Sequence, residues 1–115
     1  MAGHMRNIKS VSGQIAADTD VIAAVPGRRI KVIAYIFVTV GTGANALLIK
    51  SGGAAGLEVW RELLLGQANV PYAARLSVPA DTWLFGTRPG EQLTLDVSTS
   101  DVVHYAISYF DDDPA

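Results

Sequence analysis

The stretch from Arg29 to Val40 constrains the fold most, because it is typical of one long β-strand that is apolar on both faces. A chain of 115 residues has one hydrophobic core, which covers one side of a sheet. The other side therefore predicts burial against another layer or another subunit. We expect the core side to carry Ile30, Val32, Ala34, Ile36, Val38 and Val40. The candidate subunit interface is then Ile33, Tyr35 and Phe37.

The composition agrees with burial between subunits. Half of the residues are hydrophobic and 17% are charged, against roughly 25% charged in an average globular domain. The formal net charge of −2 gives no electrostatic signature for nucleic acid or an anionic membrane as a partner. Without cysteine the chain forms neither disulfides nor thiolate metal sites, so packing and assembly must stabilise it.

The N-terminus has the composition that tag removal leaves behind. Residues 1–5 end in a second methionine, Met5, which is the expected natural start. Residues 6–115 then fit a single domain. No apolar run approaches the roughly 18 residues of a transmembrane helix, and no secretory signal is visible. We expect a soluble protein that is made and kept inside the producing cell.

Short alternating segments separated by Gly and Pro turns predict an all-β protein, an antiparallel β-sandwich of eight or nine strands that is jelly-roll-like. The expected strands are Ile8 to Ala16, Val21 to Ala24, Arg29 to Val40, Ala46 to Lys50, Leu57 to Leu65, Tyr72 to Val78, Thr82 to Phe85, Gln92 to Val97 and Val102 to Phe110.

One of these segments, Leu57 to Leu65, also suits a helix. It contains good helix formers and is followed by Gly66, a typical helix C-cap. An isolated helix of nine residues would be marginal in water, and most of its leucines also fit a period of two. We favour a strand here and keep the helix as the alternative.

Two motifs suggest chemistry but favour simpler interpretations. The run from Gly41 to Ala46 has the G-x-G-x-x-A spacing of dinucleotide-binding loops, yet a strand rather than a helix is expected after it. Ser100, Asp101 and His104 contain the residue types of a hydrolytic triad, but His104 is expected on a strand and the other two in the preceding turn. With one native histidine, we expect no catalytic, metal or cofactor site.

The aromatic and charged residues allow two binding hypotheses. Trp60 and Trp83 are candidates for stacking a glycan, although packing is the favoured role for aromatic residues in strands. The basic residues Arg28, Arg29 and Lys31 and the acidic run from Asp111 to Asp113 are expected to be solvated ends. In an oligomer these opposite charges could also meet across an interface.

Most of the chain, from Val21 to Phe110, resembles small proteins of tailed bacteriophages and prophages. The resemblance rests on Ile30 to Val40, Lys50-Ser51-Gly52, Asn69 to Pro79, Thr82 to Thr87, Gly90 to Leu95 and Val103 to Tyr109. It implies a jelly-roll module that assembles as a trimer on a virion, in a head-decoration, head-fibre or tail-associated role. It implies no catalytic residues.

Together these observations predict a structural virion protein rather than an enzyme. A homotrimer would decorate or stabilise the particle and bind other capsid or tail proteins, after synthesis in the bacterial host cytoplasm. The alternative is a carbohydrate-binding module for host-surface recognition. No cofactor is expected under either hypothesis.

Overall fold

The computed structural model describes residues 7–39, 44–66, 70–79, 81–98 and 102–112, and within these ranges all regular structure is β-strand. This confirms the predicted all-β class, and Leu57–Leu65 is a strand rather than a helix. No helix of the described part is long and apolar enough to cross a membrane. The nine strands are β1 (Lys9–Ile15), β2 (Thr19–Ile22), β3 (Arg29–Thr39), β4 (Ala44–Ser51), β5 (Leu57–Leu65), β6 (Tyr72–Ser77), β7 (Phe85–Gly86), β8 (Leu93–Val97) and β9 (Val103–Asp112).

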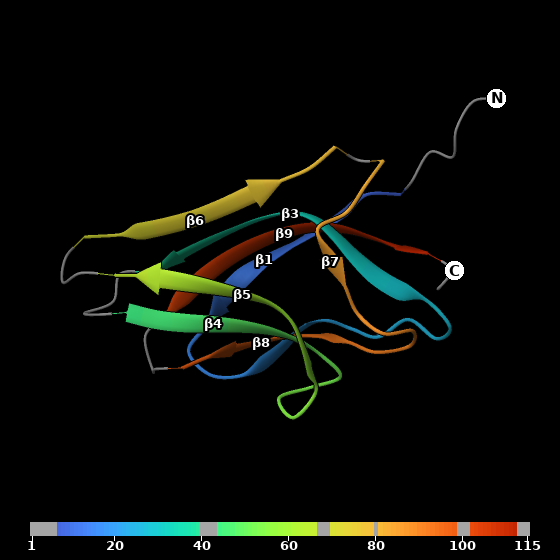
Figure 1. Ribbon diagram of the computed structural model, residues 1–115, viewed down its shortest axis with the longest axis horizontal. Coiled ribbons are helices and arrows are strands. Elements are labelled where there is room, and N and C mark those ends of the chain that lie inside the picture. The colour runs from blue at the N-terminus through green and yellow to red at the C-terminus, as the bar shows by residue number, and fades with distance from the viewer. Residues whose placement is uncertain (1–6, 40–43, 67–69, 80, 99–101, 113–115) are drawn as a thin grey trace.

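The strands form two antiparallel sheets that pack on one another (Figure 1). The five-stranded sheet has the order β1-β9-β3-β6, with β7 also paired to β3, and the four-stranded sheet has the order β2-β8-β4-β5. Apart from the two-residue β7, the pairing is nested: β1 pairs with β9, β2 with β8, β3 with β6 and β4 with β5. This nested pairing is the jelly-roll topology.

The core lies between the two sheets and is built from alternate residues of both. Its fully buried members include Ile30, Val32 and Phe37 of β3 opposite Leu47 and Ile49 of β4. The remaining buried cluster is completed by Ile15, Ile22, Tyr35, Leu64, Ala74, Phe85, Leu93, Leu95, Val97, Val103 and Ile107.

A β-bulge at Ile33 changes which face of β3 is buried. On the neighbouring strand β9, Tyr109 pairs with Val32 but the next residue, Ser108, pairs with Ala34, so Ile33 is an extra residue. An extra residue reverses the inward and outward alternation beyond it. Tyr35 and Phe37 therefore continue the inner face that Ile30 and Val32 begin.

The predicted division of the long strand into two faces is therefore wrong beyond the bulge. Ala34, Ile36 and Val38, expected in the core, point outward and are half-buried, whereas Tyr35 and Phe37 are core residues. Ile33 is buried too, so the chain itself covers all three candidate interface residues. Val40 lies outside the described residues.

The strand between β6 and β8 is also shorter than predicted and begins later. The predicted segment Thr82 to Phe85 begins in a turn, where the Thr82 amide donates to the Pro79 carbonyl. The pairing with β3 is confined to Phe85 and Gly86. The loop therefore leaves the sheet edge near Val78, whose amide donates to Ile33, and returns at Leu84, whose amide donates to Val32.

Candidate functional site

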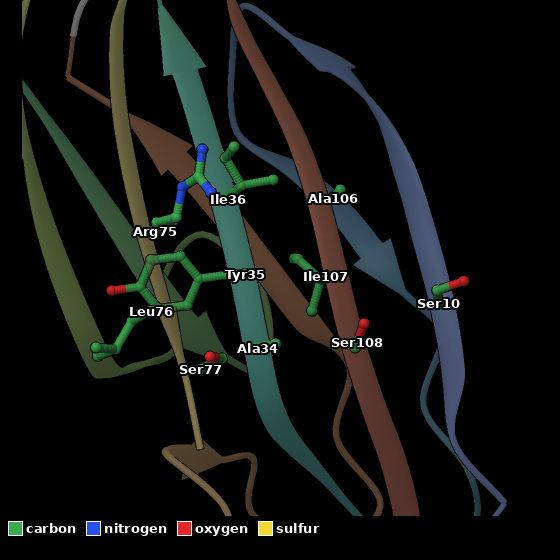
Figure 2. A pocket seen from close by; sticks show the side chains of 10 residues that line it. All are labelled: Ser10, Ala34, Tyr35, Ile36, Arg75, Leu76, Ser77, Ala106, Ile107 and Ser108. Carbon is green, nitrogen blue, oxygen red and sulfur yellow. The ribbon is translucent and has the colours of Figure 1, made fainter. Parts of the chain in front are cut away.

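The outward side of the five-stranded sheet contains a hollow of about 500 Å³, which we call the outer hollow. Figure 2 shows that its lining comes from four neighbouring strands, β1, β9, β3 and β6. The residues that line it are Ser10, Ala34, Tyr35, Ile36, Arg75, Leu76, Ser77, Ala106, Ile107 and Ser108.

The pairing register explains why this surface is hollow. One row across the four strands consists of Ser10, Ser108, Ala34 and Ser77. The next outward row consists of Ser12, Ala106, Ile36 and Arg75. Serine and alanine side chains are short, so they leave the surface of the sheet hollow at these positions. Ile36 is the largest apolar side chain in the two rows.

This surface is unusually apolar for the outward face of an antiparallel sheet. A sheet with one face in water normally alternates apolar residues inward with polar residues outward. Here Ala34, Ile36 and Val38 of β3 and Ala106 of β9 all point outward and are half-buried. The charged group of the lining is Arg75, which has no ion-pair or hydrogen-bond partner among the described residues.

The opposite end of the same outward face is covered by the chain itself. There the Lys31 ammonium group lies 2.8 Å from a carboxylate oxygen of Asp112 and 5.2 Å from the Trp83 ring centroid. It lies 5.9 Å from the ring centroid of Phe110, which is almost fully buried. This lysine is itself only 6% exposed. The free apolar surface is therefore limited to the end that carries the outer hollow.

A polar group sits between the sheets beside the aromatic part of the core. The Tyr35 hydroxyl donates to a Glu62 carboxylate oxygen at 2.5 Å and accepts a hydrogen bond from the Trp60 indole at 3.1 Å. Burial, together with the Glu62 carboxylate, raises the pKa of Tyr35 to about 12. The hydroxyl therefore stays protonated at neutral pH, and the three residues tie β3 to β5.

The two candidate glycan-stacking residues do not form a common platform. The Trp60 ring stacks on Phe85, with ring centroids 5.0 Å apart, and its indole nitrogen is already used by Tyr35. Trp83 is 37% exposed, but the Arg29 guanidinium lies 5.5 Å from the centroid of its ring. Both rings thus contact other side chains of the same chain.

The two sequence motifs that suggest chemistry lie partly outside the described residues. His104 is exposed on the outward side of β9, opposite Val38, while Ser100 and Asp101 lie outside the described residues. Of the run from Gly41 to Ala46, the described part begins strand β4 at Ala44, two residues before the predicted start at Ala46. Within the described ranges, no group of three acidic, histidine or cysteine side chains is arranged to hold a metal ion.

The basic and acidic clusters meet within the chain through Arg28 with Asp111 and Lys31 with Asp112, so they are not the separate solvated ends that the sequence predicts. The Asp111 carboxylate lies 2.8 Å from the Lys9 ammonium group and 3.6 Å from the Arg28 guanidinium. The hydrogen bond to Asp111 raises the pKa of Lys9. Asp113 lies outside the described residues. The antiparallel pairing of β3 with β9 brings the two clusters together, which their distance in sequence concealed.

The residues that form the outer hollow were missed at the sequence level, apart from those of β3. A usable signal lay in β9, where the small residues Ala106 and Ser108 alternate with the large residues Tyr105, Ile107 and Tyr109. Such alternation predicts one flat face on that strand. It does not reveal which strands lie beside it.

No protein-family model matches the chain, and no curated protein is significantly similar to it in sequence. Among solved structures, a subunit of the disulfide-linked pili of Bacillus endospore appendages is 11% identical with a TM-score of 0.47, covering 100% of this chain and 96% of that one. An arabinose-bound GH51 α-L-arabinofuranosidase is 15% identical with a TM-score of 0.44, covering 88% of this chain and 18% of that enzyme.

The virus-like particle of the extra small virus of the giant freshwater prawn, Macrobrachium rosenbergii, gives a third similar structure. Its protein is 12% identical with a TM-score of 0.35, and the match covers 95% of this chain and 83% of that one.

Proposed function

We propose that this chain is a structural subunit that assembles with copies of itself through the outer hollow. The observation that carries the proposal is the outward row of Ala34, Ile36 and Val38 beside Ala106, on a sheet face where water-facing residues are expected. Burying such side chains stabilises a complex by about 25 cal/mol per Å² of apolar surface. A second copy of the chain supplies that burial.

The finer proposal is a closed homotrimer. A cyclic assembly gives every copy the same contacts and leaves no copy with a free apolar face, whereas an open arrangement invites further growth. A stable interface buries about 1,200 Å² or more in total. The outer hollow with the neighbouring Val38 would form the centre of such a contact.

The assembly is proposed to belong to a virion or prophage-encoded particle, which the trimer decorates or stabilises by binding other capsid or tail proteins. The support is the motif resemblance described above, together with the jelly-roll pairing of the strands.

The test is the molecular mass of the Ile36→Glu variant. Ile36 is half-buried and outward on β3, so an unpaired carboxylate there would be buried in the proposed contact at a cost of several kcal/mol, about 3 or more. We expect light scattering to give the variant one third of the mass of the original chain, because the variant loses the threefold contact.

Leu48→Glu is the matched control, because Leu48 is also half-buried and outward, but on β4 of the other sheet. It should leave the mass unchanged. A mass near 12.2 kDa for the original chain at high concentration would refute self-assembly. Failure of the trimer to co-sediment with phage heads or tails would refute the particle role, and tryptophan fluorescence changes on a glycan panel would favour the carbohydrate-binding module.

A further inference from the structure

The free edge of strand β5 differs from the other three sheet edges. β6 is bounded by Pro71 and Pro79, and β1 carries Lys9 and Gly13. β2 has four residues and an irregular register. Prolines, lysines, bulges and shortness are the usual devices that keep a sheet edge from pairing with another chain. All three of these edges therefore carry such protection.

β5 carries little protection of this kind. It has an extra residue, Val59, near its start, but the stretch from Trp60 to Leu65 is in regular register with β4. The nine residues include no proline, glycine or lysine, and among the described strands β5 pairs with β4 alone. Its charges Glu58 and Arg61 are engaged with each other through hydrogen bonds of 2.8 and 3.1 Å. Leu63 and Leu65 are 56% and 55% exposed beside the unpaired backbone. The edge is thus long, apolar and available for pairing.

We propose that β5 pairs antiparallel with β5 of a second copy, in a two-fold ladder centred on Leu63. In a two-fold antiparallel pair, the residue at the centre lies opposite its own copy. A ladder centred on Arg61 would oppose two arginines, and one centred on Glu62 would oppose two carboxylates, both of which are destabilising. Centring on Leu63 opposes two leucines and places Arg61 opposite Leu65, where its aliphatic stem packs.

This contact uses the edge of the four-stranded sheet, so it is separate from the outer hollow and does not depend on it. Leu76, which is 42% exposed, lies on β6 next to β5, and the contact would cover it as well. With a ladder of five residue pairs the interface is small. We take the occupant to be a second copy because this edge is self-complementary. In the register centred on Leu63, leucine lies opposite leucine and Arg61 lies opposite Leu65, so no two like charges are opposed.

The test uses single cysteines, since the chain has none of its own. In the proposed register, Leu63→Cys places two thiols on directly opposite residues, whose Cα atoms are about 4.5 to 5.5 Å apart, within the range of a disulfide. Leu65→Cys is the matched control on the same strand and equally exposed, but its copy lies four residues away, or about 13 Å. Leu57→Cys, 50% exposed, lies outside the ladder.

Under mild oxidation, the Leu63→Cys variant should form a covalent dimer about tenfold faster or more than either control, because pairing raises the effective concentration of the thiols. Equal rates for the three variants would overturn the proposed register and contact. Faster cross-linking of Leu65→Cys would overturn the register.

The double variant Ile36→Glu/Leu63→Cys separates this inference from the proposed function. Cross-linking should persist in it even though the assembly through the outer hollow is lost. A mass change caused by Ile36→Glu, combined with no selective cross-linking at residue 63, would support the first contact and reject the second.

Discussion

The two outward sheet faces of this protein are built from the same pairing pattern and yet differ in character. On the four-stranded sheet, the outward leucines Leu48, Leu63 and Leu65 stand beside two ion pairs. These are Lys50 with Asp96 at 3.1 Å and Arg61 with Glu58 at 2.8 Å. On the five-stranded sheet, the outer hollow is lined by serine, alanine and isoleucine side chains with Arg75 at its border. A jelly roll requires apolar residues only on its inner faces. Both outward faces exceed this requirement, but among the described residues only the four-stranded sheet combines its outward leucines with ion pairs, whereas the lining of the outer hollow holds none.

The largest expected effect is the difference in the free energy of unfolding between a substitution on the inner side of β3 and one on its outer side. Phe37→Ala should destabilise the fold by about 3–5 kcal/mol, because it leaves a cavity at a site that is 0% exposed. Ile36→Ala removes a half-buried side chain and should cost about 1 kcal/mol in the dissociated protein. Urea unfolding at low protein concentration measures both. Similar losses would mean that the bulge at Ile33 does not reverse the faces.

The next effect compares the two outward faces directly. Ala106→Lys places a charge in the outer hollow and should weaken self-association by about 3 kcal/mol, roughly a hundredfold in Kd. Leu48→Lys places the same charge on the outward side of β4, opposite Asp96 and Arg61, and should leave Kd unchanged. Sedimentation over a concentration series gives both constants. Equal weakening would show that the faces do not differ in function.

A smaller effect concerns the group that joins the two sheets. Tyr35→Phe leaves the half-buried Glu62 carboxylate and the Trp60 indole without their shared partner and should cost about 1–3 kcal/mol. The raised pKa of Tyr35, about 12, also predicts that its contribution is complete below pH 10 and is lost as the pH rises from about 10 to 12.

Ultraviolet titration of the tyrosinates in the folded protein tests this pKa. The Tyr35→Phe variant should lack the step near pH 12, and retention of that step would assign it to another tyrosine.

The smallest effect belongs to the ion pair of Glu58 and Arg61 on the four-stranded sheet. The hydrogen bond from Arg61 lowers the pKa of Glu58, so this pair stabilises the fold above the ordinary pKa of a glutamate and loses that contribution as the pH falls through the lowered value. Both side chains are well exposed, so Glu58→Gln should change stability only slightly and flatten the acid dependence. Unfolding midpoints at neutral and acid pH compare the variant with the original, and a large loss at neutral pH would contradict a solvated pair.

Sequence periodicity was sufficient for most of the strands, Thr82 to Phe85 being the exception. Alternation in Tyr72 to Val78 and Gln92 to Val97, with turns at Pro26-Gly27 and Pro89-Gly90, predicted strand positions that agree with the structure to within a few residues. At Leu57 to Leu65 the strand interpretation was confirmed although local propensity suits a helix, because pairing with β4 outweighs propensity in a short segment. These features are local, so the order of residues specifies them.

Tertiary structure decided which side chains of β3 point into the core and which residues line the outer hollow. A single extra residue at Ile33 reverses every later side chain, and nothing in a continuous apolar run distinguishes a bulged strand from a regular one. Likewise, Arg75 and Ser10 come beside Ile36 and Ser108 only because β6 and β1 flank β3 and β9 in the sheet. The amino-acid order by itself determined an all-β chain with more apolar surface than one core requires. Long-range pairing decided where that surface lies, since strand neighbours far apart in sequence leave no local pattern.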